Sequence, residues 1–319
     1  IEEAGIHSGD SACSIPPYSL SATQVQKIEE STILLAKALD IKGLMNVQYA
    51  FQGEELFVIE VNPRASRTVP FVAKSTGNSI AKIAAKLMVG RKLSEFNLNC
   101  PVPSYYSVKE VTFPFGRFDK VDLLLGPEMK STGEAMGIDQ SFGVAFYKAH
   151  EAIGNKLPLK GTVFLSVRNE DKDRIVDAAK ILASLGFVLC ATRGTAQFLE
   201  KQGISVEIVN KQREGDENTV TLTRKSKFQL ILNVADKRDI TESYYLRRAA
   251  VMNRIAYVTT VRGFDAIVEA LKCIHSTQNG YGVRSLDEWV SKDAVLSSDV
   301  TDVQSECDSS VSSAKSTCC

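Results

Sequence analysis

The sequence lacks an excess of charge of either sign: 38 lysines and arginines balance 38 aspartates and glutamates in 319 residues. Such a chain creates no long-range field that would attract nucleic acid or an anionic membrane, so any phosphate that it binds has to be held by local contacts. It also lacks an apolar run near the roughly 20 residues that a membrane helix needs, and a basic leader followed by an apolar stretch. We therefore expect neither nucleic acid nor a membrane as partner.

Metal-binding cysteine and histidine patterns are also scarce. The seven cysteines and three histidines are widely spread, and no Cys-x-x-Cys pair occurs. This distribution argues against a zinc site and favours reduced thiols in a cytoplasmic protein. The chain begins at Ile1, without an initiator methionine and within a segment whose pattern indicates order. We therefore expect it to be a fragment of a longer protein.

The first half of the chain mixes helix and strand patterns. An amphipathic helix capped by Ser21 precedes two strand-like segments around a turn, which together predict a β-hairpin. A buried, alanine-rich helix follows, and then a connecting region that prolines break into short strands and loops. These elements cover, in order, residues 21–39 (helix), 44–51 and 56–62 (strands), 79–88 (helix) and 91–159 (connection).

After residue 160 strand and helix patterns alternate, which is typical of a mainly parallel sheet with helices on both faces. The expected strands are 162–167, 187–192, 205–210, 229–234 and 256–260, and the expected helices are 171–185, 195–201, 241–252 and 264–274. The predicted class is α/β, with an α+β region over 1–159 and a doubly wound domain over 160–296. The remaining residues, 297–319, are rich in serine and aspartate and predict a disordered tail.

The hairpin can be examined in more detail. A three-residue loop, Gly53–Glu55, would place Gln48 opposite Glu60 and Asn46 opposite Asn62. Because side chains alternate along strands, these four polar residues would then share one face. The opposite, apolar face would hold Val47, Tyr49, Phe51, Phe57, Ile59 and Val61.

The polar face of the hairpin carries hard oxygen donors. The amide of Gln48, the carboxylate of Glu60 and the amide of Asn62 suit Mg²⁺ that keeps phosphate oxygens as its other ligands. Arg64 and Arg67 follow directly and could neutralise a phosphoryl group in transfer. The spacing alone also allows a simpler interpretation, in which this face meets water and the arginines form surface ion pairs.

Longer motifs around the hairpin resemble one family. They are GIHSGDSA (5–12), GLMNVQYAF (43–51), VIEVNPRASRTVPF (58–71), YYSVKEV (105–111) and LLGPEMKSTGEAMG (124–137). Together they are similar to the second ATP-grasp unit of the carbamoyl-phosphate synthetase large subunit. The resemblance implies that residues 1–159 are the C-terminal part of such a unit.

The same resemblance implies roles for individual residues. Gln48, Glu60 and Asn62 would coordinate the Mg²⁺ or Mn²⁺ ions that bridge the ATP phosphates. Arg64 and Arg67 fall on the catalytic arginines of the family. The residues expected to contact ATP are Gly5, Ile6, His7, Ser8, Gln48 and Glu60.

In that family the unit phosphorylates carbamate to carbamoyl phosphate, for pyrimidine and arginine biosynthesis. The implied partners are a glutamine amidotransferase small subunit and the remainder of the large subunit, in an oligomer. Because an ATP-grasp fold closes the nucleotide between two lobes, and the preceding lobe of the family is not in this sequence, we expect the fragment alone to be inactive.

A second candidate site lies in the alternating region. In an open parallel sheet, ligands gather at the carboxyl ends of strands, and the Thr-Arg-Gly-Thr turn at 192–195 leads into a helix that could present hydroxyls and amides to an anion. The spacing alone favours a simpler interpretation, in which Thr192 and Thr195 only cap the helix and the lysines lie on the surface.

The run GTVFLSVRNEDKDRIVDAAKILASLGFVLCATRGTA (161–196) resembles the methylglyoxal-synthase-like domain at the end of the same large subunit. That domain is regulatory and implies a small nucleotide effector. The implied phosphate-binding residues are Lys172, Thr192, Thr195, Lys211 and Asn233. The hydroxyl residues usual after the asparagine are Val234 and Ala235 here, and Arg193 replaces a common histidine, which leaves the effector open.

Three other functions stay possible on the sequence alone. The chain could be an effector-binding module with an inert kinase remnant, another ATP-grasp ligase, or a freestanding methylglyoxal synthase. The last does not need the oxygen ligands of the hairpin. The long match through residue 137 and the appended domain argue against another ligase.

Overall fold

A computed structural model describes residues 1–290, apart from 97, 99–101, 119–120, 236–239 and 278–279. The chain forms two compact units, residues 1–283 and 284–319. The described part of the second unit contains the short helix α10 (Leu286–Val290), beside which the Arg284 guanidinium lies 5.1 Å from the Trp289 ring centroid. The predicted tail, 297–319, lies outside the described residues. Among those residues, no helix combines the length and apolar character needed to cross a membrane.

The N-terminal elements confirm most of the predicted order. A 3₁₀ turn, η1 (Ser8–Asp10), precedes α1 (Ala22–Ala38), in which Ser21 and Gln24 form a reciprocal capping box as the sequence suggested. The hairpin strands are β2 (Asn46–Gln52) and β3 (Glu55–Asn62), and two helices follow, α2 (Thr68–Thr76) and α3 (Ile80–Met88).

The structure of these two helices differs from the prediction, since the burial of α3 was predicted wrongly and α2 was not predicted. The prediction that α3 is buried fails, because Ala84 is its only buried residue and Met88 is 63% exposed. Small alanines fit a buried helix but do not require burial. The second miss is α2, which the sequence interpretation did not include; Pro70, near its start, is tolerated there because the first turn needs no intrahelical amide bond.

The predicted hairpin pairing is right at its functional end and wrong at its turn. Gln48 faces Glu60 and Asn46 faces Asn62, as expected. The loop, however, has two residues, Gly53 and Glu54, and an irregularity between Gln48 and Tyr49 adds one residue to β3. Gly53 has a φ of +60°, a value that glycine adopts without strain.

The bulge also changes the apolar face of the hairpin. Tyr49 pairs with Val58, and Ala50 pairs with Phe57. Because paired residues point to the same side of a sheet, Phe57 does not share a face with Tyr49 as predicted. The sequence could not distinguish a three-residue loop from a two-residue loop followed by a bulge, since both bring Gln48 opposite Glu60.

The connecting region, for which the sequence predicts short strands and loops, contains strands and also one unpredicted helix. A three-stranded antiparallel sheet has the order β1 (Cys13–Ile15), β4 (Tyr106–Thr112) and β5 (Gly133–Asp139). The 3₁₀ turns η2 (Leu93–Glu95) and η3 (Phe115–Arg117) flank β4, and α4 (Phe142–Ala152) packs on the sheet. The helix α4 was missed because it is apolar around most of its circumference, and a continuous apolar run shows no helical period.

The C-terminal sheet follows the predicted alternation closely. Its five strands are parallel, in the order β10-β9-β6-β7-β8, which is that of a doubly wound fold. The strands are β6 (Thr162–Val167), β7 (Val188–Thr192), β8 (Glu207–Val209), β9 (Leu230–Val234) and β10 (Ala256–Val258). Two 3₁₀ turns, η4 (Asn169–Asp171) and η5 (Asp173–Ile175), follow β6.

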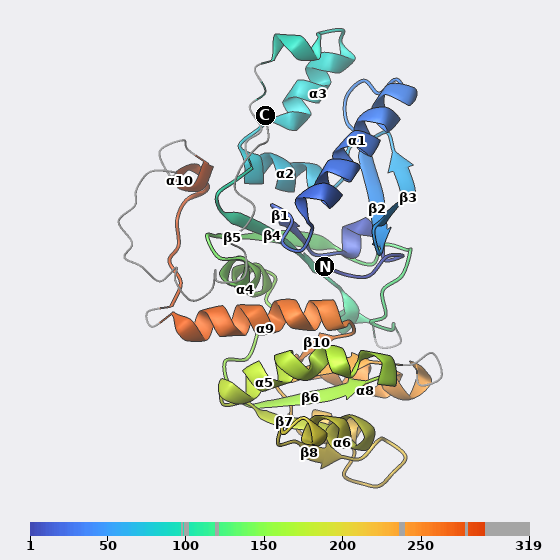
Figure 1. The fold of residues 1–319 in the computed structure, drawn as a ribbon, viewed down its shortest axis with the longest axis vertical. Helices are drawn as coiled ribbons and strands as arrows, with labels where there is room; N and C mark the ends of the chain where they lie inside the picture. Colours follow the sequence, from blue (N-terminus) through green and yellow to red (C-terminus); the bar gives the residue numbers. More distant parts are fainter. Residues whose placement is uncertain (97, 99–101, 119–120, 236–239, 278–279, 291–319) are drawn as a thin grey trace. The chain divides into compact units, whose positions relative to one another are not determined.

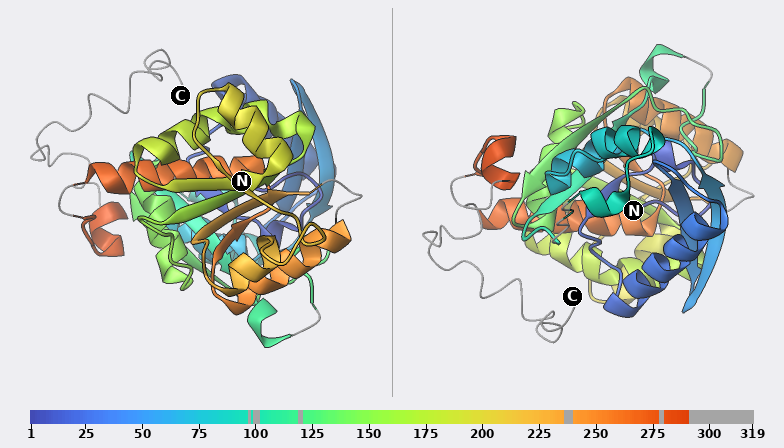
Figure 2. Two further views of the ribbon diagram at one scale, coloured as in Figure 1. Left: turned by 90° about the horizontal axis from the view of Figure 1, so that it is seen from below. Right: turned by 90° about the horizontal axis from the view of Figure 1, so that it is seen from above.

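Helices cover both faces of this sheet, as Figures 1 and 2 show for α8 and α9. In β6, Val163 and Leu165 join one core, which also contains residues of α5 (Val176–Ser184), α6 (Arg193–Lys201) and α9 (Val261–Ser276). Phe164, between them, joins a second core with α7 (Thr219–Arg224) and α8 (Ile240–Met252). Alternate burial on two faces explains why these strands read as continuous apolar runs.

The first core extends beyond the sheet through α4. A Cβ atom added to Gly143 in α4 would lie 2.7 Å from the Cys273 sulfur and 2.8 Å from the Glu269 carbonyl oxygen of α9. Only glycine permits this approach, so the backbone of α4 at Gly143 packs directly against Cys273 and Glu269 of α9.

Candidate nucleotide and phosphate sites

The structure brings the three expected metal ligands of the hairpin together. Gln48 and Glu60 are cross-strand partners, and Asn62 Nδ2 donates a hydrogen bond to Glu60 Oε1 at 2.9 Å. Gln48 Nε2 donates to the carbonyl oxygen of Ile6 at 3.0 Å, so its amide oxygen stays available as a ligand. One hydrogen bond therefore connects the hairpin to the N-terminal loop that was expected to contact ATP.

That N-terminal loop, residues 5–10, is held firmly at its far end. His7 N donates to the Gly126 carbonyl at 2.8 Å, and His7 Nδ1 accepts from Gly9 N at 3.0 Å. The fully buried Asp10 accepts hydrogen bonds from the backbone amides of Lys130 and Ser131, both at 2.8 Å. The sequence interpretation did not assign Asp10 a role, although it lies within a quoted motif.

The remaining loop residues and the two arginines differ in their exposure and in their hydrogen-bond partners. Gly5 is exposed with a φ of +95°, and Ser8 begins η1. Arg67 Nη1 donates to Ser131 Oγ at 3.0 Å, and Ser131 Oγ donates to the Gly9 carbonyl at 2.7 Å. Arg67 is thus joined to the loop, whereas the exposed Arg64 donates to the neighbouring Ala65 carbonyl.

A buried lysine also approaches this region and was not singled out from sequence. The Lys109 side chain is 2% exposed, and its Nζ lies 3.4 Å from the Ser8 carbonyl oxygen and 4.0 Å from Glu134 Oε2. The sequence could have indicated a role for Lys109, because a lysine on a buried strand such as β4 is unusual unless it is paired.

The chemistry of the donor set fits a hard cation. No group of three or more histidine, cysteine, aspartate or glutamate side chains with metal-binding geometry occurs within the described part of the chain. One carboxylate and two amides form a weak ligand set by themselves, which suits Mg²⁺ held mainly by phosphate oxygens and water.

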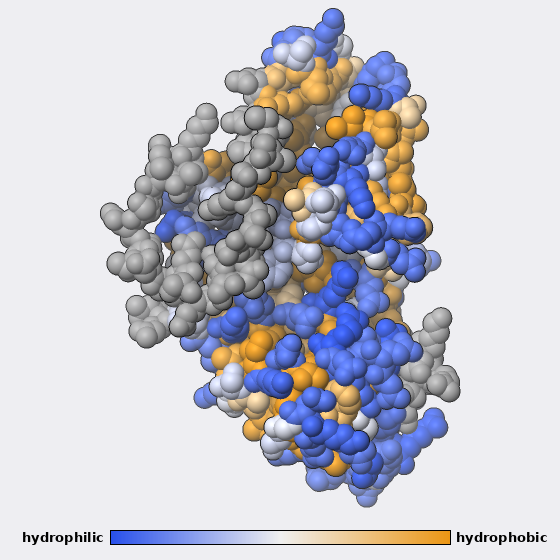
Figure 3. Space-filling model, viewed as in Figure 1, coloured by the Kyte–Doolittle hydropathy of each residue, from blue (hydrophilic) through white to orange (hydrophobic). Residues whose placement is uncertain are grey.

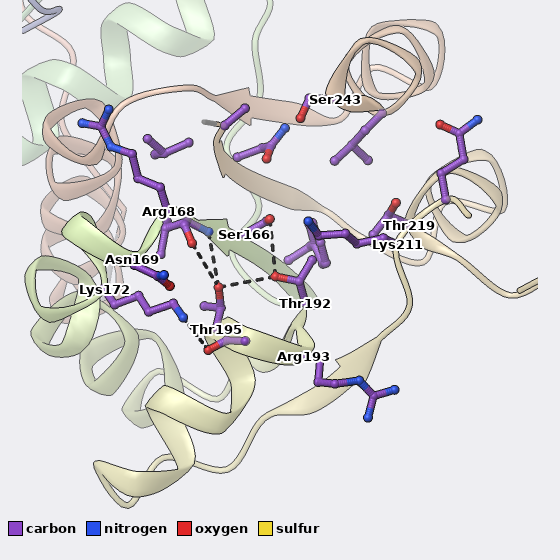
Figure 4. Close-up of a pocket in the computed structure, with 18 of the residues that line it drawn as sticks. Ser166, Arg168, Asn169, Lys172, Thr192, Arg193, Thr195, Lys211, Thr219 and Ser243 are labelled. Atoms are coloured by element: carbon purple, nitrogen blue, oxygen red, sulfur yellow. Dashed lines mark hydrogen bonds between the residues drawn. The ribbon is translucent and has the colours of Figure 1, made fainter. Parts of the chain in front are cut away.

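The second site is a cavity of about 360 Å³ at the carboxyl ends of β6, β7 and β9 (Figure 4). All five predicted phosphate-binding residues line it: Lys172, Thr192, Thr195, Lys211 and Asn233. Its position is the topological switch point of the sheet, where β6 is flanked by β7 on one side and β9 on the other.

Hydroxyl groups form the floor of the cavity. Thr192 Oγ1 lies 3.4 Å from both Ser166 Oγ and Thr195 Oγ1, and Thr192 and Thr195 are 7% and 1% exposed. Lys172 Nζ donates to the Gly194 carbonyl at 2.7 Å beside them. Figure 4 shows these side chains converging.

The alternative that Thr192 only caps α6 is wrong. Thr192 occupies the N-cap position with extended backbone angles, but its side chain makes no capping hydrogen bond. The first residues of this nine-residue helix, Arg193, Gly194 and Thr195, line the cavity, and their amides donate to no capping side chain of Thr192. Free amides at a helix N-terminus are suited to an anion.

Several lining residues were missed or were only noted as departures. Ser166, Thr219 and Ser243 add hydroxyls that the sequence interpretation did not include, because they lie far apart in the chain. Val234 and Ala235 do line the cavity. Arg193 lines it as well, but Figure 4 shows its side chain directed away from the threonine cluster.

Two family models match different parts of the chain. Residues 2–96 match the family model of the carbamoyl-phosphate synthase L chain ATP-binding domain, and residues 174–259 match that of the MGS-like domain. The two matches define the class: a protein with an ATP-binding region followed by an MGS-like domain.

Relatives specify the family further. The chain is 47% identical over 309 residues to the carbamoyl phosphate synthase large chain, C-terminal section, of Aquifex aeolicus, covering 90% of this chain and 58% of that protein. It is 49% identical over 279 residues to the large chain of Ralstonia nicotianae, and 50% identical over 274 residues to that of Pseudomonas syringae pv. tomato. Each of the latter matches covers 85% of this chain and 26% of the relative.

The chain belongs to the carbamoyl phosphate synthase large-chain family, and it spans about a quarter of the length of the two longer relatives. Among solved structures, methylglyoxal synthase from Elizabethkingia anophelis NUHP1 aligns with 43% of this chain and 93% of its own, at 16% identity and a TM-score of 0.30.

Proposed function

We propose that residues 1–159 supply part of an ATP site that phosphorylates carbamate, and that residues 160–296 form a regulatory domain that binds a phosphorylated nucleotide. The observation that carries the first part is the convergence of Gln48, Glu60 and Asn62 on one face, tied to Ile6 by the Gln48 amide. The alternative of a polar face that merely meets water does not explain this connection to the loop.

In the proposed reaction a carbamate oxygen attacks the γ-phosphorus of ATP in line, and ADP leaves with the electrons of the broken P–O bond. Mg²⁺ or Mn²⁺, when bound, would neutralise charge on the phosphate oxygens. Gln48, Glu60 and Asn62 would hold the cations through oxygen atoms. Arg67, fixed by Ser131, and Arg64 would stabilise negative charge on the phosphoryl group, while Gly5, Ile6, His7 and Ser8 would position the nucleotide.

The proposed setting follows from the names of the relatives, which are large chains. We propose a complex with a glutamine amidotransferase small subunit and with the rest of a large subunit, oligomeric and cytoplasmic, serving pyrimidine and arginine biosynthesis.

The activity is tested by measuring carbamoyl phosphate formed from ATP, bicarbonate and glutamine. We expect the protein in its complete natural form to be active and residues 1–319 alone to be inactive. Effector binding without any turnover in the complete protein would favour the inert-module alternative. Turnover by residues 1–319 alone would overturn the requirement for a second lobe.

The regulatory site is tested by equilibrium binding of UMP, IMP and inorganic phosphate. Lys211→Ala should weaken binding at least about tenfold, because a charge-assisted hydrogen bond to phosphate is lost. Lys225→Ala is the matched control, since Lys225 is exposed and paired with Glu217. Equal effects of both substitutions would reject the cavity as the phosphate site.

A further inference from the structure

Three polar side chains form a row at the floor of the cavity, across three neighbouring strands. Ser166 on β6 pairs with Asn233 on β9, and Thr192 Oγ1 on β7 lies 3.4 Å from Ser166 Oγ. Phe164, two residues before Ser166, belongs to the core that contains residues of α7 and α8, so the row points to the side of the sheet that these helices cover. The two ends of the row, Thr192 and Asn233, are separated by two strand spacings, or roughly 10 Å between backbones.

The end of the row at β7 consists of hydrogen-bond donors. Thr192 Oγ1 and Thr195 Oγ1 lie 3.4 Å apart, and the ammonium group of Lys172 lies beside them on the Gly194 carbonyl. Thr192 makes no side-chain capping bond to α6, so the first amides of the helix add further donors. Hydroxyl, amide and ammonium groups can all donate to the oxygens of one phosphate. A phosphate is therefore best held on the β7 side of β6.

The end of the row at β9 presents an acceptor instead. Asn233 is 5% exposed, and its Nδ2 donates to the Tyr257 hydroxyl on β10 at 2.8 Å. Asn233 lines the cavity, and its Oδ1 has no hydrogen-bond partner among the residues that the structure describes. An amide oxygen has no hydrogen to give, so it repels a phosphate oxygen and attracts an N–H or O–H group.

The side chains around Asn233 make the same distinction. Val234, Ala235 and Leu246 line the cavity and carry no polar side-chain atom. The family resemblance predicts hydroxyl residues at positions 234 and 235, and this chain has neither. A phosphate at the β9 end would therefore meet an acceptor and apolar side chains, whereas the β7 end supplies donors.

We infer that the cavity binds a phosphate monoester in one orientation, with the phosphate at Thr192 and Thr195 and an N–H or O–H donor of the organic part at Asn233 Oδ1. Ser243, which Figure 4 shows across the cavity from Lys172 and Thr195, offers a hydroxyl to the same organic part. Asn233 is thus a specificity residue for a hydroxyl-bearing or amine-bearing compound such as a nucleoside, rather than a phosphate ligand. This inference rests on the proposed regulatory function and refines its ligand.

The test compares the affinities of residues 1–319 for UMP, IMP and inorganic phosphate by equilibrium binding. Asn233→Leu keeps a side chain of similar size and removes the acceptor. Affinity for the nucleotides should fall about threefold to tenfold, the cost of one hydrogen bond between neutral groups, while affinity for inorganic phosphate stays within about twofold. The matched control is Asn253→Leu, directly after α8 and outside the cavity, which should change none of the affinities.

Asn233→Asp should shift the discrimination in the opposite direction. The carboxylate keeps an acceptor for the organic part, and a hydrogen bond to a charged group is stronger than one to a neutral amide. Its charge weakens every phosphate in the cavity alike, so the informative quantity is the ratio of nucleotide affinity to inorganic phosphate affinity. We expect this ratio to rise about threefold in Asn233→Asp and to fall in Asn233→Leu.

A role of Asn233 as phosphate ligand gives a different result. If Nδ2 donated to the phosphate, Asn233→Leu would weaken inorganic phosphate and nucleotide together by about tenfold, and the ratio would stay at its wild-type value in both variants. That outcome would overturn the inference, and so would an unchanged nucleotide affinity in Asn233→Leu. If Asn233→Leu does not fold, the ratio in Asn233→Asp decides, and its failure to rise rejects the inference.

The wild-type chain separates this inference from the proposed function. If nucleotides bind the wild-type chain and the Asn233 variants leave the ratio unchanged, the regulatory site stands and only the orientation is rejected. If neither inorganic phosphate nor a nucleotide binds the wild-type chain, the regulatory site is rejected and the inference with it.

Discussion

The two candidate sites differ in how completely this chain builds them. The cavity at β6, β7 and β9 is formed by nearly buried side chains, such as Thr195 at 1% and Asn233 at 5% exposure. The hairpin site is open: Glu60 is exposed, and the neighbouring Val58 and Ile59 are 48% and 49% exposed. The cavity is therefore pre-organised within the chain, whereas the hairpin presents its candidate ligands on an open surface.

The surface of the hairpin supports the same contrast. Phe57, Val58 and Ile59 form a run of exposed apolar residues on β3, and Figure 3 shows hydrophobic residues gathered over this side of the molecule. In the C-terminal sheet the central strand β6 is covered on both faces, with Val163, Phe164 and Leu165 fully buried. One site is supported by a complete core and the other by an uncovered two-stranded sheet.

The largest effect is expected from Glu60→Gln in the complete protein. The substitution keeps an oxygen ligand but removes the only charge of the set, so ATP-dependent carbamoyl phosphate formation should fall on the order of 100-fold. Binding of UMP or IMP to the cavity should not change, because the two sites use separate ligands. Glu55→Gln, at the exposed start of β3, is the control and should be active. Full activity of Glu60→Gln would remove the basis for a metal site here.

A smaller loss is expected from Thr195→Val in the cavity. Valine has the same shape, so the fold is kept while one buried hydroxyl of the cluster is lost. Affinity for UMP, IMP or inorganic phosphate should fall roughly tenfold, the usual cost of a hydrogen bond to a charged group. The matched control is Thr76→Val in α2, which does not line the cavity. Isothermal calorimetry on residues 1–319 gives both affinities, and equal values would show that the hydroxyl cluster is not the phosphate floor.

The contrast also explains what could be predicted from sequence. The strands of the covered sheet were predicted from apolar runs bounded by helix patterns. The strand ends, together with the family resemblance, indicated Lys172, Thr192 and Asn233, which line the cavity. The pairing at the functional end of the hairpin was predicted correctly, because Gln48 lies opposite Glu60 in either of the two possible turns.

What escaped prediction depends on contacts between distant segments. Ser243 and Arg247 both lie on α8. Ser243 lines the cavity and Arg247 contacts Asp122 because of how α8 packs in the fold, and no local sequence pattern encodes that packing. The bulge in β3 could not be predicted either, because the sequence gives the same pairing of Gln48 with Glu60 with or without it. The helix α4 was not predicted, because it is buried on most sides and its sequence has no polar stripe.

A gain of affinity would sharpen the description of the cavity. Val234→Thr places a hydroxyl at the end of β9 with little change in volume, next to the proposed ligand Asn233. Nucleotide affinity should rise about threefold to tenfold if a ligand oxygen lies within reach. Val188→Thr, at the 46% exposed start of β7, is the control. If Val234→Thr binds no more tightly than this control, the occupant does not approach the end of β9.

The smallest effect concerns the stability of the open region. Ser21→Ala removes the hydrogen bond from Gln24 N to Ser21 Oγ, one of the two bonds of the capping box at the start of α1, and should cost about 1 kcal/mol, or roughly fivefold faster amide exchange within α1. Because α1 has no buried residue, the loss should stay local and leave exchange in β6 unchanged. Ser31→Ala, inside the same helix, is the control and should be neutral or slightly stabilising, since alanine has the better helix propensity. Faster exchange in β6 as well would show that the open and covered regions unfold together, and that their difference in burial does not translate into a difference in local stability.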